Sequence, residues 1–165
     1  MLGYIEKILI VDDNKDVRET LFAQFELDEE VECFIASDGV EALKVLEEFE
    51  VHMVITDLNM PNLNGLDFCK EIRVRNQEVG LVVICGDIKT RDCLELLKLG
   101  ISNIYLKPMN LEEVYVEIKA MLEKRIVAEM ENVFLEKLFQ EQAEIENYSE
   151  LSISDKAKIL IDYIE

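Results

Sequence analysis

Four charged side chains follow short apolar segments of the kind that form buried strands. Asp12 and Asp13 come directly after one apolar run, and Asp57 closes another. Lys107 closes a third run, just before a proline. Carboxylate oxygens are the ligands that Mg²⁺ prefers, and a lysine ammonium binds phosphate as a point charge. If these side chains converge, they predict a divalent-metal site that handles a phosphoryl group.

The pattern around these residues predicts the elements that would position them. Strand-like and helix-like segments alternate five times with short connections. The predicted strands are residues 8–11, 31–35, 53–57, 81–84 and 104–107. This alternation is typical of a parallel sheet with helices on both faces. In such sheets, ligands bind beyond the carboxyl ends of the strands, where the strand order reverses. If strands one and three are neighbours, with strand five nearby, the charged residues meet in one crevice.

Several residues are expected to begin or end the helices. Asn14 is predicted to cap the first helix, and either Ser37 or Asp38 can cap the second. The inner face of the second helix should carry three apolar residues: Val40, Leu43 and Leu46. Gly100 should end the fourth helix.

Gly65 and His52 have structural interpretations. Gly65 is expected either to permit a positive φ or to start its helix. His52 opens the third predicted strand and has no evident ligand partner, so we expect it at the surface.

Together these residues resemble the receiver domain of two-component response regulators, most closely the short chemotaxis-type receivers. The shared motif has three parts: Asp12-Asp13, then Asp57 with Asn59-Met60-Pro61 and Gly65, and finally Lys107-Pro108. The resemblance covers roughly residues 5–122. It implies a flavodoxin-like, doubly wound five-stranded parallel sheet in the order 2-1-3-4-5. Residues 1–124 would form the receiver domain, and residues 125–165 a C-terminal helical extension.

The resemblance also implies a chemistry. Receivers accept a phosphoryl group on an aspartate, here Asp57, from a histidine kinase or phosphotransfer protein, and they use Mg²⁺. By resemblance, Asp13 and Asp57 would bind the metal directly, Asp12 mainly through water, and Asn59 through its backbone carbonyl. Lys107 would neutralise a phosphoryl oxygen, and its bond to the following proline is usually cis in the family. Such a chain is a signalling phosphoacceptor and not an enzyme in the usual sense.

Two positions depart from the receiver pattern. Cys85 stands where receivers usually carry Thr or Ser, and Ile104 stands where they usually carry Tyr or Phe. A thiol is a weaker donor than a hydroxyl. A loss of about 1–1.5 kcal/mol would lower the active population by a factor of roughly 5–13. Tyr105 lies one position after Ile104, and on a strand its side chain should face the opposite way. Nearby carboxylates should also raise the pKa of Cys85.

Two functions remain open after these departures. The leading interpretation is a phosphorylation-switched receiver, supported by the complete set of acids and lysine. The alternative is an adaptor or dimerisation module that keeps the fold without depending on phosphorylation, supported by Cys85 and Ile104. A phosphatase using Asp57 is disfavoured, because the best-known superfamily with that chemistry needs a second acid two residues later, where Asn59 stands.

The fifth predicted helix continues beyond the receiver resemblance without Gly or Pro. Its first apolar stripe should pack on the sheet: Leu111, Val114, Ile118, Met121 and Leu122. A second stripe is rotated from the first: Ile126, Met130, Val133, Phe134 and Leu138. A break is predicted near residues 147–149, with Ser154 capping a last helix. The extension either folds back on the domain or forms a dimerisation or partner-docking helix, and both interpretations stay open.

Composition narrows the class of partners. The net charge of −19 opposes binding to DNA or anionic lipid, so no direct nucleic-acid or membrane partner is predicted. No apolar run approaches the ~18 residues that a membrane span needs. The cysteines show no CxxC spacing, and no signal peptide is evident, which predicts a cytoplasmic protein with free thiols. Unless the chain is a fragment, its tail is too short for a DNA-binding or catalytic output domain, so protein–protein contacts should carry the output.

Overall fold

The computed structural model describes residues 5–75 and 78–143. Five parallel strands form one sheet in the order β2-β1-β3-β4-β5, which confirms the predicted flavodoxin-like fold. The strands are β1 (Glu6–Val11), β2 (Val31–Ala36), β3 (Met53–Asp57), β4 (Gly80–Cys85) and β5 (Asn103–Leu106). The helices are α1 (Lys15–Glu26), α2 (Gly39–Glu48), α3 (Gly65–Val74), α4 (Thr90–Lys98) and α5 (Leu111–Ala143).

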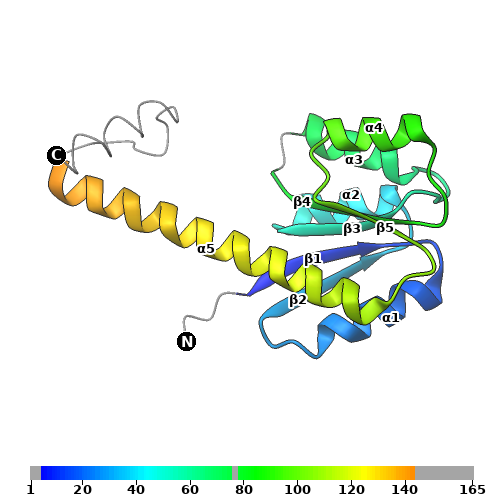
Figure 1. Cartoon of the computed structure of the whole chain (residues 1–165), viewed down its shortest axis with the longest axis horizontal. Helices are drawn as coiled ribbons and strands as arrows, with labels where there is room; N and C mark the ends of the chain where they lie inside the picture. The colour runs from blue at the N-terminus through cyan, green and yellow to red at the C-terminus, as the bar shows by residue number, and fades with distance from the viewer. Residues whose placement is uncertain (1–4, 76–77, 144–165) are drawn as a thin grey trace. The chain divides into compact units, whose positions relative to one another are not determined.

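Helices lie on both faces of the sheet (Figure 1), and each face has an apolar core. Helices α2, α3 and α4 cover one face, where Leu9, Val54 and Phe68 are fully buried. On the other face, α1 and the first turns of α5 pack over Ile8 and Ile10, and Ile118 of α5 is fully buried there. Because both faces are covered, the central strands carry unbroken apolar runs, such as residues 8–11 in β1 and 53–55 in β3. The first stripe of α5 therefore packs on the sheet, as predicted.

The helix caps agree with the prediction, and one residue predicted on the inner face of α2 does not. The Asn14 side chain accepts hydrogen bonds from the backbone N–H groups at the start of α1. Asp38, not Ser37, caps α2 in the same way. The prediction that Val40 lies on the inner face of α2 was wrong, because Val40 is 44% exposed while Ala42 is fully buried. In the first turn, Ala42 faces the core in place of Val40, while Leu46 is buried as predicted.

Gly65 starts α3, but its conformation is not the reason for a glycine there. Among the described glycines, positive φ occurs at Gly100, which ends α4 as predicted. A Cβ at Gly65 would lie 2.0 Å from the carbonyl oxygen of Asp57. Gly65 is therefore required by the close approach of two backbone segments.

The expectation that His52 lies at the surface was also wrong. Its side chain is 15% exposed, and its Nδ1 atom lies 2.7 Å from Oε2 of Glu6, whose side chain is 3% exposed. The backbone N–H of His52 donates to the carbonyl of Lys7 over 2.8 Å. Pairing of β3 with β1 thus places His52 beside a buried acid that is distant in sequence.

The chain divides between Leu122 and Glu123 into two units. Helix α5 runs through this position without interruption. The assignment of residues 125–165 to a separate functional extension stays a prediction, and the predicted break at 147–149 and the helix from Ser154 lie outside the described residues. Each helix within residues 5–75 and 78–143 is too short or too polar to cross a bilayer.

Candidate functional site

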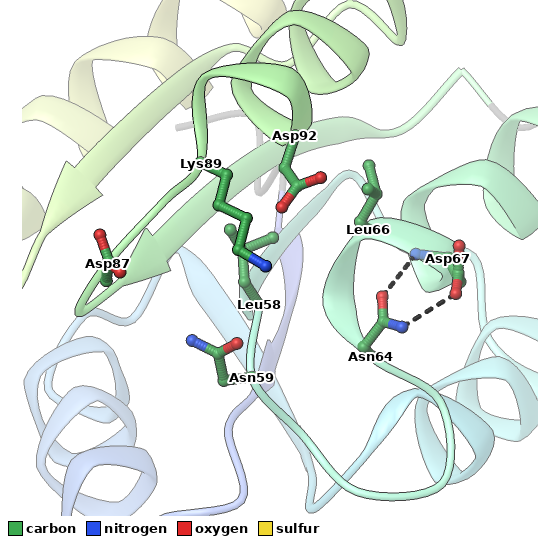
Figure 2. Close-up of a pocket in the computed structure, with 8 residues that line it drawn as sticks. All are labelled: Leu58, Asn59, Asn64, Leu66, Asp67, Asp87, Lys89 and Asp92. Carbon is green, nitrogen blue, oxygen red and sulfur yellow. Dashed lines mark hydrogen bonds between the residues drawn. The ribbon is translucent and has the colours of Figure 1, made fainter.

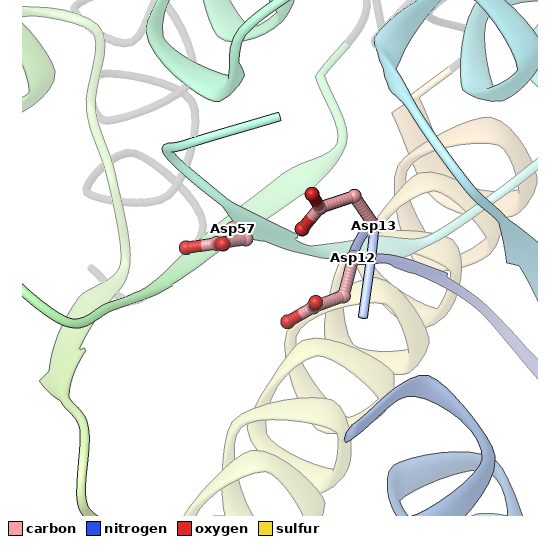
Figure 3. A group of neighbouring side chains, drawn as sticks. All are labelled: Asp12, Asp13 and Asp57. Atoms are coloured by element: carbon pink, nitrogen blue, oxygen red, sulfur yellow. The ribbon is translucent and has the colours of Figure 1, made fainter. Parts of the chain in front are cut away.

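The three aspartates predicted to act together do converge. Strands β1 and β3 pair in parallel with Val11 beside Thr56, so Asp12 and Asp57 leave neighbouring strand ends side by side. One carboxylate oxygen from each of Asp12, Asp13 and Asp57 lies within 4.8 Å of the others. Figure 3 shows the three side chains gathered beyond the ends of β1 and β3. Asp12 and Asp57 are buried, whereas Asp13 is exposed to solvent.

Lys107 joins this cluster from the end of β5. Its ammonium lies 2.9 Å from Oδ2 of Asp12 and 3.4 Å from Oδ2 of Asp57. Its backbone N–H donates to the carbonyl of Cys85 over 2.7 Å, which ties the chain after β5 to the end of β4. The peptide bond from Lys107 to Pro108 is cis. One cation is thus paired with two of the three clustered carboxylates.

Backbone groups orient the two buried acids. Oδ1 of Asp12 accepts a hydrogen bond from the Asn14 N–H over 2.8 Å. Oδ1 of Asp57 accepts one from the Leu58 N–H over 2.8 Å. Arg18, which the sequence did not single out, donates from its guanidinium to the backbone carbonyl of Asp12. The available signal for Arg18 was its position in the first turn of α1, the helix that follows the acidic pair.

The electrostatic environment follows from burial and charge. Burial raises the pKa of Asp57; Lys107 lowers it in part, and Asp12 raises it further. Burial alone would lower the pKa of Lys107, but its hydrogen bond to Asp12 and the charges of Asp12 and Asp57 outweigh that effect and raise it. Burial raises the pKa of Cys85, and the charge of Asp57 adds to the shift. The site therefore disfavours a further anion unless positive charge enters with it.

Comparison with known proteins identifies the family. A family model described as the response regulator receiver domain matches residues 8–119. The chain belongs to this family. It carries the receiver domain of two-component systems, whose members are signalling proteins.

Individual relatives are longer than this chain. It is 32% identical over 120 residues to the response regulator ArlR of Staphylococcus saprophyticus, covering 72% of this chain and 53% of the relative. It is 30% identical over 156 residues to the aerobic respiration control protein ArcA of Escherichia coli, covering 92% of this chain and 62% of the relative. The chain thus spans less than two thirds of either relative.

Solved structures show the same receiver fold. Chemotaxis protein CheY4 of Vibrio cholerae matches with a TM-score of 0.63 and 25% identity, covering 70% of this chain and 98% of that one. A CheY-like receiver from Methanospirillum hungatei matches with a TM-score of 0.69 and 22% identity, covering 75% and 98%, which shows the fold alone.

The donor set fits the ion that receivers bind. Receiver domains hold Mg²⁺ in an acidic pocket. Mg²⁺ in proteins typically takes one or two carboxylates and keeps several waters. In this receiver two carboxylates are buried and one faces solvent, so the cluster offers oxygen ligands together with access for water.

A pocket of about 330 Å³ opens next to the loop that follows Asp57. Leu58 and Asn59 line it from that loop, and Asp87 and Lys89 line it from the segment between β4 and α4. In Figure 2 the Lys89 side chain reaches across the pocket above Leu58. Asn59 thus lines this pocket two positions after Asp57, and its part as a metal ligand stays a prediction.

The two departures from the receiver pattern have clear positions. Cys85 ends β4 and is fully buried. Ile104 packs against the core under α2, α3 and α4, whereas Tyr105 packs against the opposite core. The Tyr105 hydroxyl donates to Oε2 of Glu117 on α5 over 2.6 Å. The expectation that Tyr105 faces away from the position of Ile104 is confirmed.

Proposed function

We propose that Asp57 accepts a phosphoryl group from a histidine kinase or phosphotransfer protein and that Mg²⁺ supports the transfer. The observation that carries this proposal is the convergence of Asp12, Asp13 and Asp57 beside Lys107. Asp13 and Asp57 would hold the ion directly, Asp12 mainly through water, and Asn59 through its carbonyl. Bound there, Mg²⁺ supplies positive charge that offsets the repulsion between the carboxylates and the incoming phosphoryl group.

The protein's own residues have distinct parts in the transfer. A carboxylate oxygen of Asp57 forms a bond to phosphorus while the bond from phosphorus to the donor's imidazole nitrogen breaks, and the imidazole keeps the electron pair. Two unit charges ~4 Å apart repel by roughly 4 kcal/mol at an effective dielectric of ~20. The Lys107 ammonium, 3.4 Å from Asp57, is placed to neutralise a phosphoryl oxygen. Asp12 holds that ammonium through its own ion pair.

The direct test is phosphorylation of the purified chain. Incubation with Mg²⁺ and a small phosphodonor such as acetyl phosphate should add one phosphoryl group, located at Asp57 by peptide mass spectrometry. Asp57→Asn should abolish the adduct, and chelation of Mg²⁺ should prevent it. Asp67→Asn is the matched control, because this exposed acid on α3 lies outside the cluster. No adduct on the wild-type chain would contradict the proposal.

A second function is supported by the departures from the receiver pattern at Cys85 and Ile104. Cys85 and Ile104 replace the hydroxyl and the aromatic ring that usually respond to phosphorylation, which favours an adaptor that works without it. Beryllofluoride, a mimic of the phosphoryl group, separates the two functions. A change in oligomeric state or partner binding when the mimic binds supports the switch, whereas binding without any such change supports the adaptor.

Protein–protein contacts are the proposed output. Val127 and Met130 of α5 are 54% and 51% exposed, which supports docking of a partner or self-association through this helix. Sedimentation of the chain at micromolar concentration tests the homodimer, and a monomer there rules it out. The charge of −19 supports the proposal that this chain does not itself bind nucleic acid. Location in the cytoplasm remains a proposal too.

A further inference from the structure

The loop that follows Asp57 is held to a neighbouring loop by a side-chain pair. Nδ2 of Asn62 donates a hydrogen bond to Oδ2 of Asp38 over 2.5 Å, across 24 positions of sequence. Asn62 has a φ of 61°, a left-handed conformation in which asparagine is enriched and most other residues are rare. An unusual backbone conformation in the middle of the loop thus coincides with a contact to the start of α2.

Asp38 uses its two oxygens for two different contacts. Oδ1 accepts hydrogen bonds from the N–H groups of Val40 and Glu41, over 2.8 and 2.9 Å, and so caps α2. Oδ2 is left to accept the bond from Asn62. The hydrogen bonds from Glu41 and Asn62 lower the pKa of Asp38, so the side chain is an anion at neutral pH. The bonds to α2 fix the position of the Asp38 carboxylate, and this carboxylate in turn holds Asn62 in the loop.

Backbone packing holds the same loop at two further points. A Cβ at Gly39 would lie 2.8 Å from the carbonyl oxygen of Leu63, so the start of α2 touches the loop after Asp57 directly. At the other end, the Gly65 N–H donates to the Leu58 carbonyl over 3.0 Å. Asn59 lies between the fixed Leu58 and the fixed Asn62.

We propose that Asp38 and Asn62 are positioning residues that hold the Asn59 carbonyl in place for Mg²⁺. The inference rests on the proposed function, in which that carbonyl is a metal ligand. Without the hydrogen bond, Asn62 can relax toward negative φ, and the segment from Asn59 to Asn62 shifts with it. Loss of a group that orients a metal ligand costs roughly 10–100-fold in affinity. Because Asn62 is exposed and water can replace part of the bond, we expect about tenfold.

The test is the Mg²⁺ affinity of the apo chain, measured by calorimetry in the wild type, three loop variants and Asp13→Asn. Asn62→Gly removes the donor and still accepts positive φ. Asp38→Ser keeps a cap for α2 but is too short to reach Asn62. The double variant Asp38→Asn with Asn62→Asp exchanges donor and acceptor, keeps the net charge, and places Asp at a positive φ that it tolerates. We expect about tenfold weaker binding in each single variant, and near-wild-type binding in the exchanged pair.

The outcomes separate this inference from the proposed function. Unchanged Mg²⁺ affinity in Asn62→Gly overturns the inference even if Asp57 is phosphorylated. An exchanged pair that binds as weakly as the single variants overturns it as well, because the hydrogen bond is then not the cause. Wild-type binding that is absent, or that Asp13→Asn leaves unchanged, overturns the proposed function and the inference together. Thermal unfolding of each variant shows that a lost affinity is not lost folding.

Discussion

Two buried carboxylates, those of Asp12 and Asp57, share the Lys107 ammonium at the site, and their distances from it differ. Asp12 has the closer ion pair with Lys107, at 2.9 Å against 3.4 Å for Asp57. Burial raises the pKa of Asp57, and the more distant Lys107 offsets that effect only in part. Positive charge that enters the site should therefore favour the ionised form of Asp57.

Asp57→Asn should stabilise the metal-free protein at neutral pH. Folding raises the pKa of Asp57, so the folded state favours the protonated carboxyl. This contribution to the free energy of unfolding is fully present below pH 3.8, the usual pKa of the group. It is lost as pH rises through the raised pKa. A neutral amide avoids the loss, and we expect a gain of about 1 kcal/mol at pH 7. Urea unfolding should show the gain shrinking as pH falls toward the usual Asp value. A gain that is constant with pH would contradict this origin.

Cys85→Thr should strengthen the response to phosphorylation. A hydroxyl is a better donor to a charged oxygen than a thiol, by about 1 kcal/mol, so the switched population should rise roughly fivefold. The measurement is the fraction of switched protein, by NMR or partner binding, at a fixed concentration of beryllofluoride. Cys85→Ala is the matched control and should lower that fraction. Equal fractions in all three proteins would show that this position does not take part.

Connections between elements decide how accurately the site is built. The parallel pairing of β1 with β3 brings Asp12 to Asp57, and the loop into α3 passes directly over the end of β3. On the opposite face, Lys119 of α5 lies 2.6 Å from Asp28 and 2.9 Å from Glu30, which connect α1 to β2. Both arrangements join segments that are remote in sequence.

Gly65→Ala should damage both stability and the site. The added Cβ would lie 2.0 Å from the Asp57 carbonyl oxygen, so the backbone of β3 or α3 must move. We expect a loss of about 2–3 kcal/mol in the free energy of unfolding, together with slower phosphorylation of Asp57. Gly86→Ala is the matched control, because a Cβ there meets nothing within 4 Å. Equal stability of the two variants would contradict the close-approach argument.

Lys119→Met should weaken the attachment of α5 to the α1–β2 connection. Burial alone would raise the pKa of Asp28, but hydrogen bonds from Lys119, the Glu30 backbone and Tyr115 outweigh it and lower the pKa. The stabilisation is present above the usual value of 3.8 and is lost as pH falls through the lowered pKa. We expect a cost of about 1–2 kcal/mol at pH 7, between the values for exposed and buried pairs.

Denaturant unfolding at neutral and acid pH measures this cost. The cost of Lys119→Met should shrink once Asp28 is protonated. Lys124 is an exposed lysine on the same helix, and Lys124→Met is the control, which should change the free energy of unfolding by less than about 0.5 kcal/mol. A cost that persists unchanged at acid pH would indicate lost packing instead of a lost ion pair.

The molecule as a whole carries 36 acidic and 17 basic residues, and its self-repulsion should respond to salt. Raising the salt concentration from 0.01 M to 0.15 M shortens the Debye length from about 30 Å to about 8 Å, so distant charges repel each other less. Added NaCl should therefore raise the thermal midpoint of unfolding, with a gain on the order of 1 kcal/mol from many weak repulsions. Measurement at pH 4.4, near the sequence pI, is the control, since the salt effect should vanish there. Destabilisation by salt at pH 7 would show that local ion pairs outweigh the net charge.

Much of the architecture could be predicted, because it depends on neighbours in the chain. The buried strand before Asp12, the Asn14 cap and the Gly100 helix end all follow from local residue types. The errors came where a long-range contact overrode the local pattern. His52 reads as a polar strand start but pairs with the buried Glu6. Val40 fits an inward stripe by its spacing, yet the packing of α2 on the sheet buries Ala42 and leaves Val40 exposed.

Residue types and spacing alone determined the order of strands and helices, and with it the positions at which metal and phosphoryl chemistry could occur. Only the tertiary structure decided which remote side chains meet, such as Lys107 with Asp12 across 95 positions and Asn62 with Asp38 across 24. The reason is physical: helix caps and the apolar runs that form strands depend on the nearest residues in sequence. Distances between side chains on different loops depend on strand register, backbone packing and burial, which exist only once the sheet is complete.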